Sequence, residues 1–128
     1  MSSENISQVF EGQAQRIFQD GLALLQQGNI EAADALFAQA HQLNSNNVDA
    51  LNLLGIRSYQ KNDHQKALAF LNQANVLSPN SAQTLSNLGL THTAILKFQE
   101  ALYFFDLAIE SNSNIPEVHN QADRSPLK

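Results

Sequence analysis

Four histidines, His41, His64, His92 and His119, are the side chains of this sequence best suited to bind a metal or to carry a proton near neutral pH. Helices that bind zinc often carry two histidines four residues apart, as in the HExxH motif. No two histidines have that spacing here, and cysteine is absent, so neither a zinc site nor a thiolate nucleophile is expected. Each histidine is interpreted as an ordinary helix residue.

Motifs for phosphate binding and nucleophilic catalysis are also missing from the sequence. The five glycines form no glycine-rich phosphate loop, and there is no GxSxG turn to present a serine nucleophile. The chain is therefore not expected to be an enzyme, and no metal or other cofactor is expected.

Composition and charge exclude further classes of function. The chain is 43% hydrophobic and 15% charged, which favours a packed core over disorder. Its net charge is −5 and its seven Lys and Arg residues do not cluster, so nucleic-acid binding is not expected. No apolar run approaches the roughly 18 residues that span a bilayer, and the amino terminus does not read as a signal peptide. The expectation is a soluble cytoplasmic protein without membrane insertion.

A repeat organises the sequence. The stretch LNLLGIRSY at Leu51–Tyr59 returns 34 residues later as LSNLGLTHT at Leu85–Thr93, and a fixed period of this kind indicates stacked structural units. The period divides the chain into units at residues 14–47, 48–81 and 82–115. Small residues recur in register at positions 8, 20 and 27 of the units, namely Gly21, Gly55 and Gly89; Ala33, Ala67 and Ala101; Ala40, Ala74 and Ala108.

Within the units, apolar residues recur at helical spacing on both sides of a break. The break at Asn62 and Asp63 offers a residue that tolerates left-handed geometry and then a good helix N-cap, and Gly28 and Asn29 offer the same pair. Each unit is predicted to be a helix, a tight turn and a second helix, with small residues where the helices cross closely. Leu96 takes the first turn position in the third unit, where a positive φ would strain it.

The second unit combines these features in the order Leu51-x-x-Leu54-Gly55-x-x-x-Tyr59 and Ala67-x-x-x-Leu71-x-x-Ala74-x-x-x-x-Pro79. This pattern resembles the tetratricopeptide repeat, which has the same period. The resemblance covers residues 14–115 and implies an all-α fold, a right-handed solenoid of three helix-turn-helix repeats. Residues 1–13 are expected to lead into the first helix, and residues 116–128 to form a capping helix or a partial fourth repeat.

Proteins of this family generally hold a peptide or a partner helix in a concave groove lined by the first helix of each unit. The resemblance places eight candidate contacts in that groove: Phe18, Gln19, Leu22, Asn52, Ile56, Tyr59, Asn87 and Leu90. The groove positions include no Lys or Arg, so the clamp that some repeats use for acidic chaperone tails is not expected. Two ligand types stay open, an extended peptide held by side-chain amides and an apolar or amphipathic segment.

The function expected from these features is a non-catalytic protein-protein interaction module with a protein or peptide partner. Self-association is left open. Two alternatives also stay open: an amino-terminal array of, or derived from, a larger enzyme such as a glycosyltransferase, and a small secretion chaperone. The sequence does not identify the partner.

Overall fold

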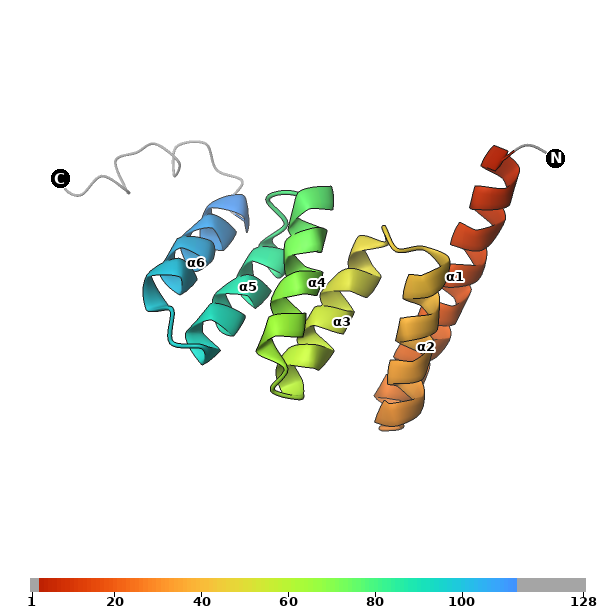
Figure 1. Ribbon diagram of the computed structural model, residues 1–128, viewed down its shortest axis with the longest axis horizontal. Coiled ribbons are helices and arrows are strands. Elements are labelled where there is room, and N and C mark those ends of the chain that lie inside the picture. The colour runs from red at the N-terminus through yellow and green to blue at the C-terminus, as the bar shows by residue number, and fades with distance from the viewer. Residues whose placement is uncertain (1–2, 113–128) are drawn as a thin grey trace.

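The computed structural model describes residues 3–112, which form six helices and no strand (Figure 1). The helices are α1 (Ser3–Gln26), α2 (Ile30–Leu43), α3 (Val48–Gln60), α4 (His64–Leu77), α5 (Ala82–Ala94) and α6 (Phe98–Asn112). They pack in the pairs α1 with α2, α3 with α4, and α5 with α6. The predicted all-α fold of three helix-turn-helix units is confirmed.

From residue 3 on, the predicted lead-in is part of the first helix. Helix α1 takes in residues 3–13 of the predicted lead-in, so lead-in and first helix are continuous. The predicted tail at 116–128 lies outside the described residues, as do residues 113–115 and His119.

The turn within each pair follows one pattern. Gly28, Asn62 and Leu96 have φ angles of 83°, 67° and 66°, the left-handed geometry expected at this position. After the second turn, the Asp63 carboxylate accepts a hydrogen bond from the backbone N–H of Lys66 at 3.3 Å, as an N-cap does. The left-handed residue at each turn, predicted from the period, is confirmed.

The glycines in register leave room for a large side chain of the paired helix. A β-carbon at Gly55 would lie 2.6 Å from Leu71 Cγ, and one at Gly21 or Gly89 would lie 2.6 Å from the ring of Phe37 or Phe105. These distances are well inside van der Waals contact, so a methyl group at any of the three glycines would force the facing side chain to move. The alanines in register are buried as well, from Ala33 at 0% exposure to Ala108 at 6%.

The helix pairs are joined unequally. The third pair packs on the second through both α3 and α4, and a buried hydrogen bond from Thr84 Oγ1 to Asn52 Oδ1 at 2.9 Å crosses that junction. Between the first and second pairs the packing is mainly between α2 and α3 and is less extensive. The first junction is therefore the less tightly packed of the two.

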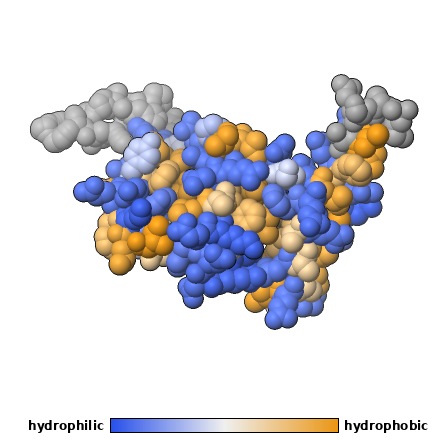
Figure 2. Space-filling model, viewed as in Figure 1, coloured by the Kyte–Doolittle hydropathy of each residue, from blue (hydrophilic) through white to orange (hydrophobic). Residues whose placement is uncertain are grey.

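Hydrophobic side chains are exposed over several parts of the row of helices, its two ends among them (Figure 2). On α6 the exposed side chains are Phe98, Leu102, Tyr103 and Ile109, and on the first turns of α1 they are Ile6, Val9 and Phe10. Within residues 3–112, no helix is both long and apolar enough to cross a membrane.

Candidate functional site

The predicted groove residues lie on α1, α3 and α5, but they differ in how much surface they offer. Phe18 is 5% exposed, and its ring centre lies 5.7 Å from that of Phe37 in the core of the first pair. Asn52 is 2% exposed and is occupied by its hydrogen bond from Thr84. Both side chains are in contact with other parts of the protein interior. They therefore support this face from behind and expose little surface to a ligand.

The remaining candidates are more accessible, with one exception. Gln19 and Leu90 are exposed, and Leu22, Ile56 and Tyr59 are half-buried. Together these five residues give the face a mainly apolar surface with an amide at one end.

Asn87 is the exception. Its side chain is 9% exposed, and its amide nitrogen Nδ2 is buried without a hydrogen-bond partner among the described residues. A buried donor left unpaired costs roughly 1 to 3 kcal/mol. Asn87 therefore holds an unused donor on the helix that also carries Leu90.

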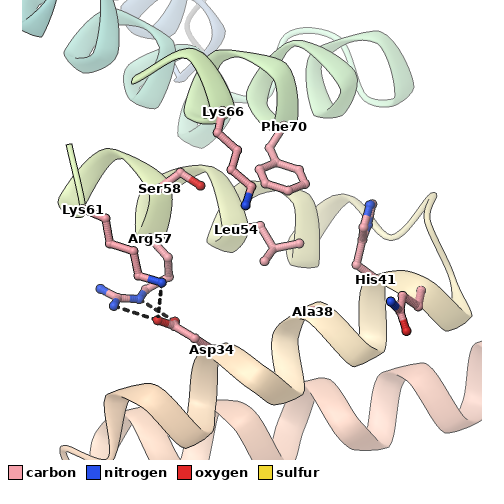
Figure 3. A pocket seen from close by; sticks show the side chains of 10 residues that line it. Asp34, Ala38, His41, Leu54, Arg57, Ser58, Lys61, Lys66 and Phe70 are labelled. Atoms are coloured by element: carbon pink, nitrogen blue, oxygen red, sulfur yellow. Dashed lines mark hydrogen bonds and ion pairs between the residues drawn. The ribbon is translucent and has the colours of Figure 1, made fainter. Parts of the chain in front are cut away.

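A cavity of about 250 Å³ lies between α2, α3 and α4 (Figure 3). The repeat pattern of the sequence does not predict it. Its lining residues are Asp34, Ala38, His41, Gln42, Leu54, Arg57, Ser58, Lys61, Lys66 and Phe70. Leu54 and Arg57 share one face of α3, whereas Asn52, Ile56 and Tyr59 lie on the opposite face by the helical period of 3.6 residues. The cavity and the predicted groove are therefore on different sides of the molecule.

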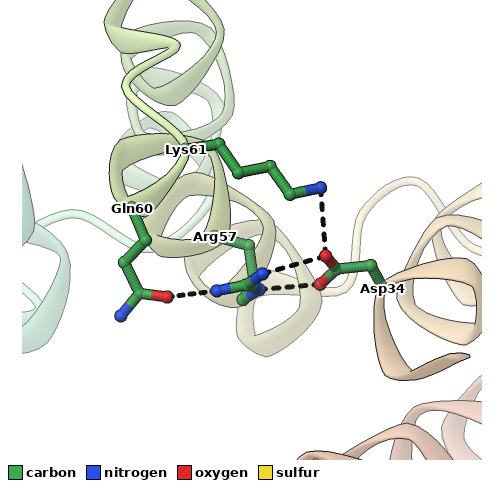
Figure 4. A network of polar contacts seen from close by, with 4 residues as sticks. All are labelled: Asp34, Arg57, Gln60 and Lys61. Atoms are coloured by element: carbon green, nitrogen blue, oxygen red, sulfur yellow. Dashed lines mark hydrogen bonds and ion pairs between the residues drawn. The ribbon is translucent and has the colours of Figure 1, made fainter. Parts of the chain in front are cut away.

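Charged side chains lie at one end of this cavity (Figure 3) and form a network of polar contacts (Figure 4). Arg57 donates two hydrogen bonds to the Asp34 carboxylate, from Nε to Oδ1 at 2.7 Å and from Nη2 to Oδ2 at 3.0 Å. Lys61 Nζ lies 3.0 Å from Asp34 Oδ2, and Arg57 Nη1 also donates to Gln60 Oε1. This network connects α2 with α3 across the first junction.

The network shifts the pKa values of Asp34 and Arg57. The hydrogen bond from Arg57 holds the pKa of the Asp34 carboxyl below its ordinary value of 3.8, an effect that partial burial opposes and Lys61 reinforces. The same hydrogen bond raises the pKa of Arg57. Both groups are therefore charged at neutral pH.

A comparison of the units would have indicated the ion pair. Asp34 occupies position 21 of its unit, where the others have Leu68 and Leu102, and Arg57 occupies position 10, where the others have Ala23 and Thr91. Two opposite charges in adjacent units, at positions that hold uncharged residues in the other units, indicate an ion pair between those units.

The three histidines among residues 3–112, His41, His64 and His92, lie on three different helices. The ring of His41 meets Phe70 edge-on at 5.6 Å, His64 lies against Tyr59, and His92 Nδ1 is 2.8 Å from the carbonyl oxygen of Leu88. Across the part of the chain that the structure describes, no three His, Asp or Glu side chains gather as a metal site would require.

Comparisons with known proteins point in one direction. A family model described as tetratricopeptide repeat matches residues 24–88. The fold is similar to the second such domain of Spaghetti (RPAP3) bound to the HSP90 peptide SRMEEVD, with 16% identity, a TM-score of 0.79, and coverage of 87% of this chain and 96% of that one.

Two further solved structures have the same fold. The tetratricopeptide-repeat domain of Sgt2 from Aspergillus fumigatus has 22% identity, a TM-score of 0.71, and coverage of 80% of this chain and 68% of that one. MamA has 23% identity, a TM-score of 0.69 and coverage of 77% of this chain, which spans 57% of MamA. The sequence matches no curated protein.

Proposed function

The chain belongs to the tetratricopeptide-repeat family, and on that premise we propose that it is a non-catalytic interaction module that holds a peptide or partner helix on α1, α3 and α5. The structure of Spaghetti (RPAP3) with a bound HSP90 peptide supports a peptide as the ligand class. The eight candidate contacts are Phe18, Gln19, Leu22, Asn52, Ile56, Tyr59, Asn87 and Leu90. Phe18 and Asn52 are buried, so they support the accessible contacts from behind.

One observation supports this face more than any other. The buried Nδ2 of Asn87 lacks a hydrogen-bond partner among the described residues, and a turn of this side chain toward solvent would let it donate to a backbone carbonyl of a bound segment. Leu90 lies three residues further along α5, at 41% exposure, and offers apolar contact beside that donor. An amide next to apolar surface suits the backbone and side chains of a peptide together.

The chemistry of the ligand follows from the charge of this face. The eight candidate contacts include no Lys or Arg, so an acidic peptide such as SRMEEVD has no cation to pair with there. The proposed ligand is instead an apolar or amphipathic segment, held by Leu22, Ile56, Tyr59 and Leu90 and by amide hydrogen bonds.

The test begins with affinity capture and mass spectrometry to identify a partner, followed by binding measurements on Tyr59→Ala and Asn87→Ala. Each truncation is expected to weaken binding by at least about fivefold, the equivalent of roughly 1 kcal/mol, because each removes a contact. Asn87→Ala removes an unpaired donor, so its melting temperature is expected to equal or exceed that of the parent.

The control is Glu100→Ala, an exposed residue in the first turn of α6. Its binding is expected to match the parent. If a partner binds the Tyr59→Ala/Asn87→Ala double variant as tightly as the parent, with unchanged circular dichroism, the proposal for this face fails.

A further inference from the structure

The cavity between α2, α3 and α4 concentrates positive charge on an acidic protein. The chain has a net charge of −5 and seven Lys and Arg residues, and three of the seven, Arg57, Lys61 and Lys66, line this one cavity. Its lining includes a single carboxylate, Asp34. With three positive charges against one negative, the lining carries a formal charge of +2.

Two of the three cations are already engaged. Arg57 and Lys61 both bind the Asp34 carboxylate at one end of the cavity. Lys66 differs, because its ammonium group has no hydrogen bond or ion pair with any described residue. Figure 3 shows its side chain directed from α4 into the cavity, toward Leu54 on α3. Lys66 is also exposed to solvent, so it is a cation at the mouth of the cavity that pairs with no described residue.

The surroundings of Lys66 combine apolar walls with a second unused polar atom. Ala38, Leu54 and Phe70 supply the apolar part of the lining. His41, on the facing helix α2, has a buried Nδ1 without a hydrogen-bond partner among residues 3–112. A group that enters from solvent would meet an ammonium donor on one side and an imidazole on the other.

We propose that this cavity binds a glutamate or aspartate side chain from an acidic segment of a partner protein, as a second docking point on the face of α3 opposite the groove. The volume of about 250 Å³ is below the roughly 300 to 1,000 Å³ of pockets for small molecules, so it suits a side chain better than a cofactor. Lys66 pairs with the carboxylate, and the methylenes pack on Leu54 and Phe70.

The single unpaired cation and the apolar lining favour a carboxylate side chain over a phosphate. Arg57 and Lys61 are already paired with Asp34, so Lys66 is the cation left to bind an incoming anion. A carboxylate that binds Lys66 leaves the Asp34 ion pairs in place. A phosphate has no methylene chain to pack on Leu54 and Phe70.

The experiment is a titration of the ¹⁵N-labelled protein, followed by amide chemical shifts, with an acetylated and amidated hexapeptide of four glutamates and two leucines. Shifts are expected at the cavity residues of α2, α3 and α4, and they are expected to weaken with added salt. The matched peptide with glutamine in place of glutamate is expected to produce little change.

Two lysine variants locate the site. Lys66→Gln is expected to weaken binding about three- to fivefold, because it removes the unpaired cation, and Lys66→Glu is expected to weaken it further. Lys97→Gln is the matched control: an exposed lysine outside the cavity, without an ion pair to described residues, whose loss is expected to change affinity less than twofold.

Several results would overturn the inference. Equal binding of the glutamine peptide, or an unchanged affinity of Lys66→Gln, would remove the carboxylate or the lysine from the site. A stronger response to inorganic phosphate than to the peptide would contradict a carboxylate site. Shifts confined to the face of Ile56 and Tyr59 would move the acidic peptide to the groove. Tyr59→Ala/Asn87→Ala is expected to bind the acidic peptide like the parent, so failure here and failure of the groove proposal are distinguishable.

Discussion

Leu96 is the residue whose backbone geometry fits its side chain least. Its φ of 66° is shared by turn positions that glycine and asparagine occupy in the other units. The same hydrogen bonds close the turn, from Leu96 N to the carbonyl of Thr93 at 3.0 Å and from Lys97 N to that of His92 at 2.8 Å. A leucine pays a steric cost in this region because its β-carbon approaches a carbonyl oxygen.

Replacing Leu96 by glycine is expected to raise stability. Relief of the left-handed strain contributes about 1 to 2 kcal/mol, and the greater freedom of glycine in the unfolded chain offsets about 0.5 to 1 kcal/mol of it. Little packing is lost, since the side chain is 73% exposed. The measurement is the urea midpoint of unfolding. Leu96→Ala keeps the β-carbon and serves as the control without a gain; a lower midpoint for Leu96→Gly would contradict the strain.

Residue-level contacts are also where prediction from the sequence was weakest. The period assigns Asn52 to a face of its helix, but its burial depends on Thr84, which reaches it from the next unit. Likewise, the meeting of Asp34 with Arg57 involves side chains 23 residues apart in different units. A pattern within one unit carries no information on such partners, so the cavity could not be predicted from it.

At the scale of elements, prediction was more successful because each helix pair repeats the same turn geometry and the same close packing between its two helices. The left-handed turn at Asn62 and the close packing at Gly55 both follow from residue types that recur after 34 residues. Position 8 and position 24 of a unit form one contact, between Gly55 and Leu71 in the second unit.

The stability cost of replacing a repeat glycine by alanine is expected to depend on the position of its helix pair in the array. Gly55→Ala forces a methyl group against Leu71, which is fully buried, and overpacking of about 1 to 3 kcal/mol exceeds the helix-propensity gain of roughly 1 kcal/mol. In Gly89→Ala the half-buried ring of Phe105 can turn toward solvent, so the two effects are expected to cancel within about 0.5 kcal/mol. Thermal melts compare the two variants. A larger loss of stability for Gly89→Ala than for Gly55→Ala would contradict the expectation that the second pair is the less tolerant of the two.

At the scale of the whole molecule, the ion pairs of Asp34 connect two repeats that otherwise share limited packing. Asp34→Asn is expected to cost about 1 to 2 kcal/mol at pH 7, because it leaves Arg57 partly buried without its counter-ion. Since the pKa of Asp34 is lowered by folding, this stabilisation is present above the ordinary value of 3.8 and is lost as pH falls through the lowered value.

The difference in urea midpoint between the parent and Asp34→Asn is therefore expected to be full at pH 7 and to shrink below about pH 3.8. Asp106→Asn, which alters an exposed acid on α6 without an ion pair among described residues, is expected to leave the midpoint unchanged at each pH. A difference for Asp34→Asn that persists undiminished at pH 3 would exclude the carboxylate as its source.

The unequal junctions have a mechanical consequence. A tension applied between α1 and α6 passes through every junction in series, so the protein extends first where adjacent repeats share the least packing, between α2 and α3. The Asp34 ion pairs bridge that junction and resist the separation of its two helix pairs. Because dissolved ions screen charges, the resistance of this junction to extension is expected to fall with ionic strength. The junction between the second and third pairs, which the buried hydrogen bond between Thr84 and Asn52 crosses, is expected to change less.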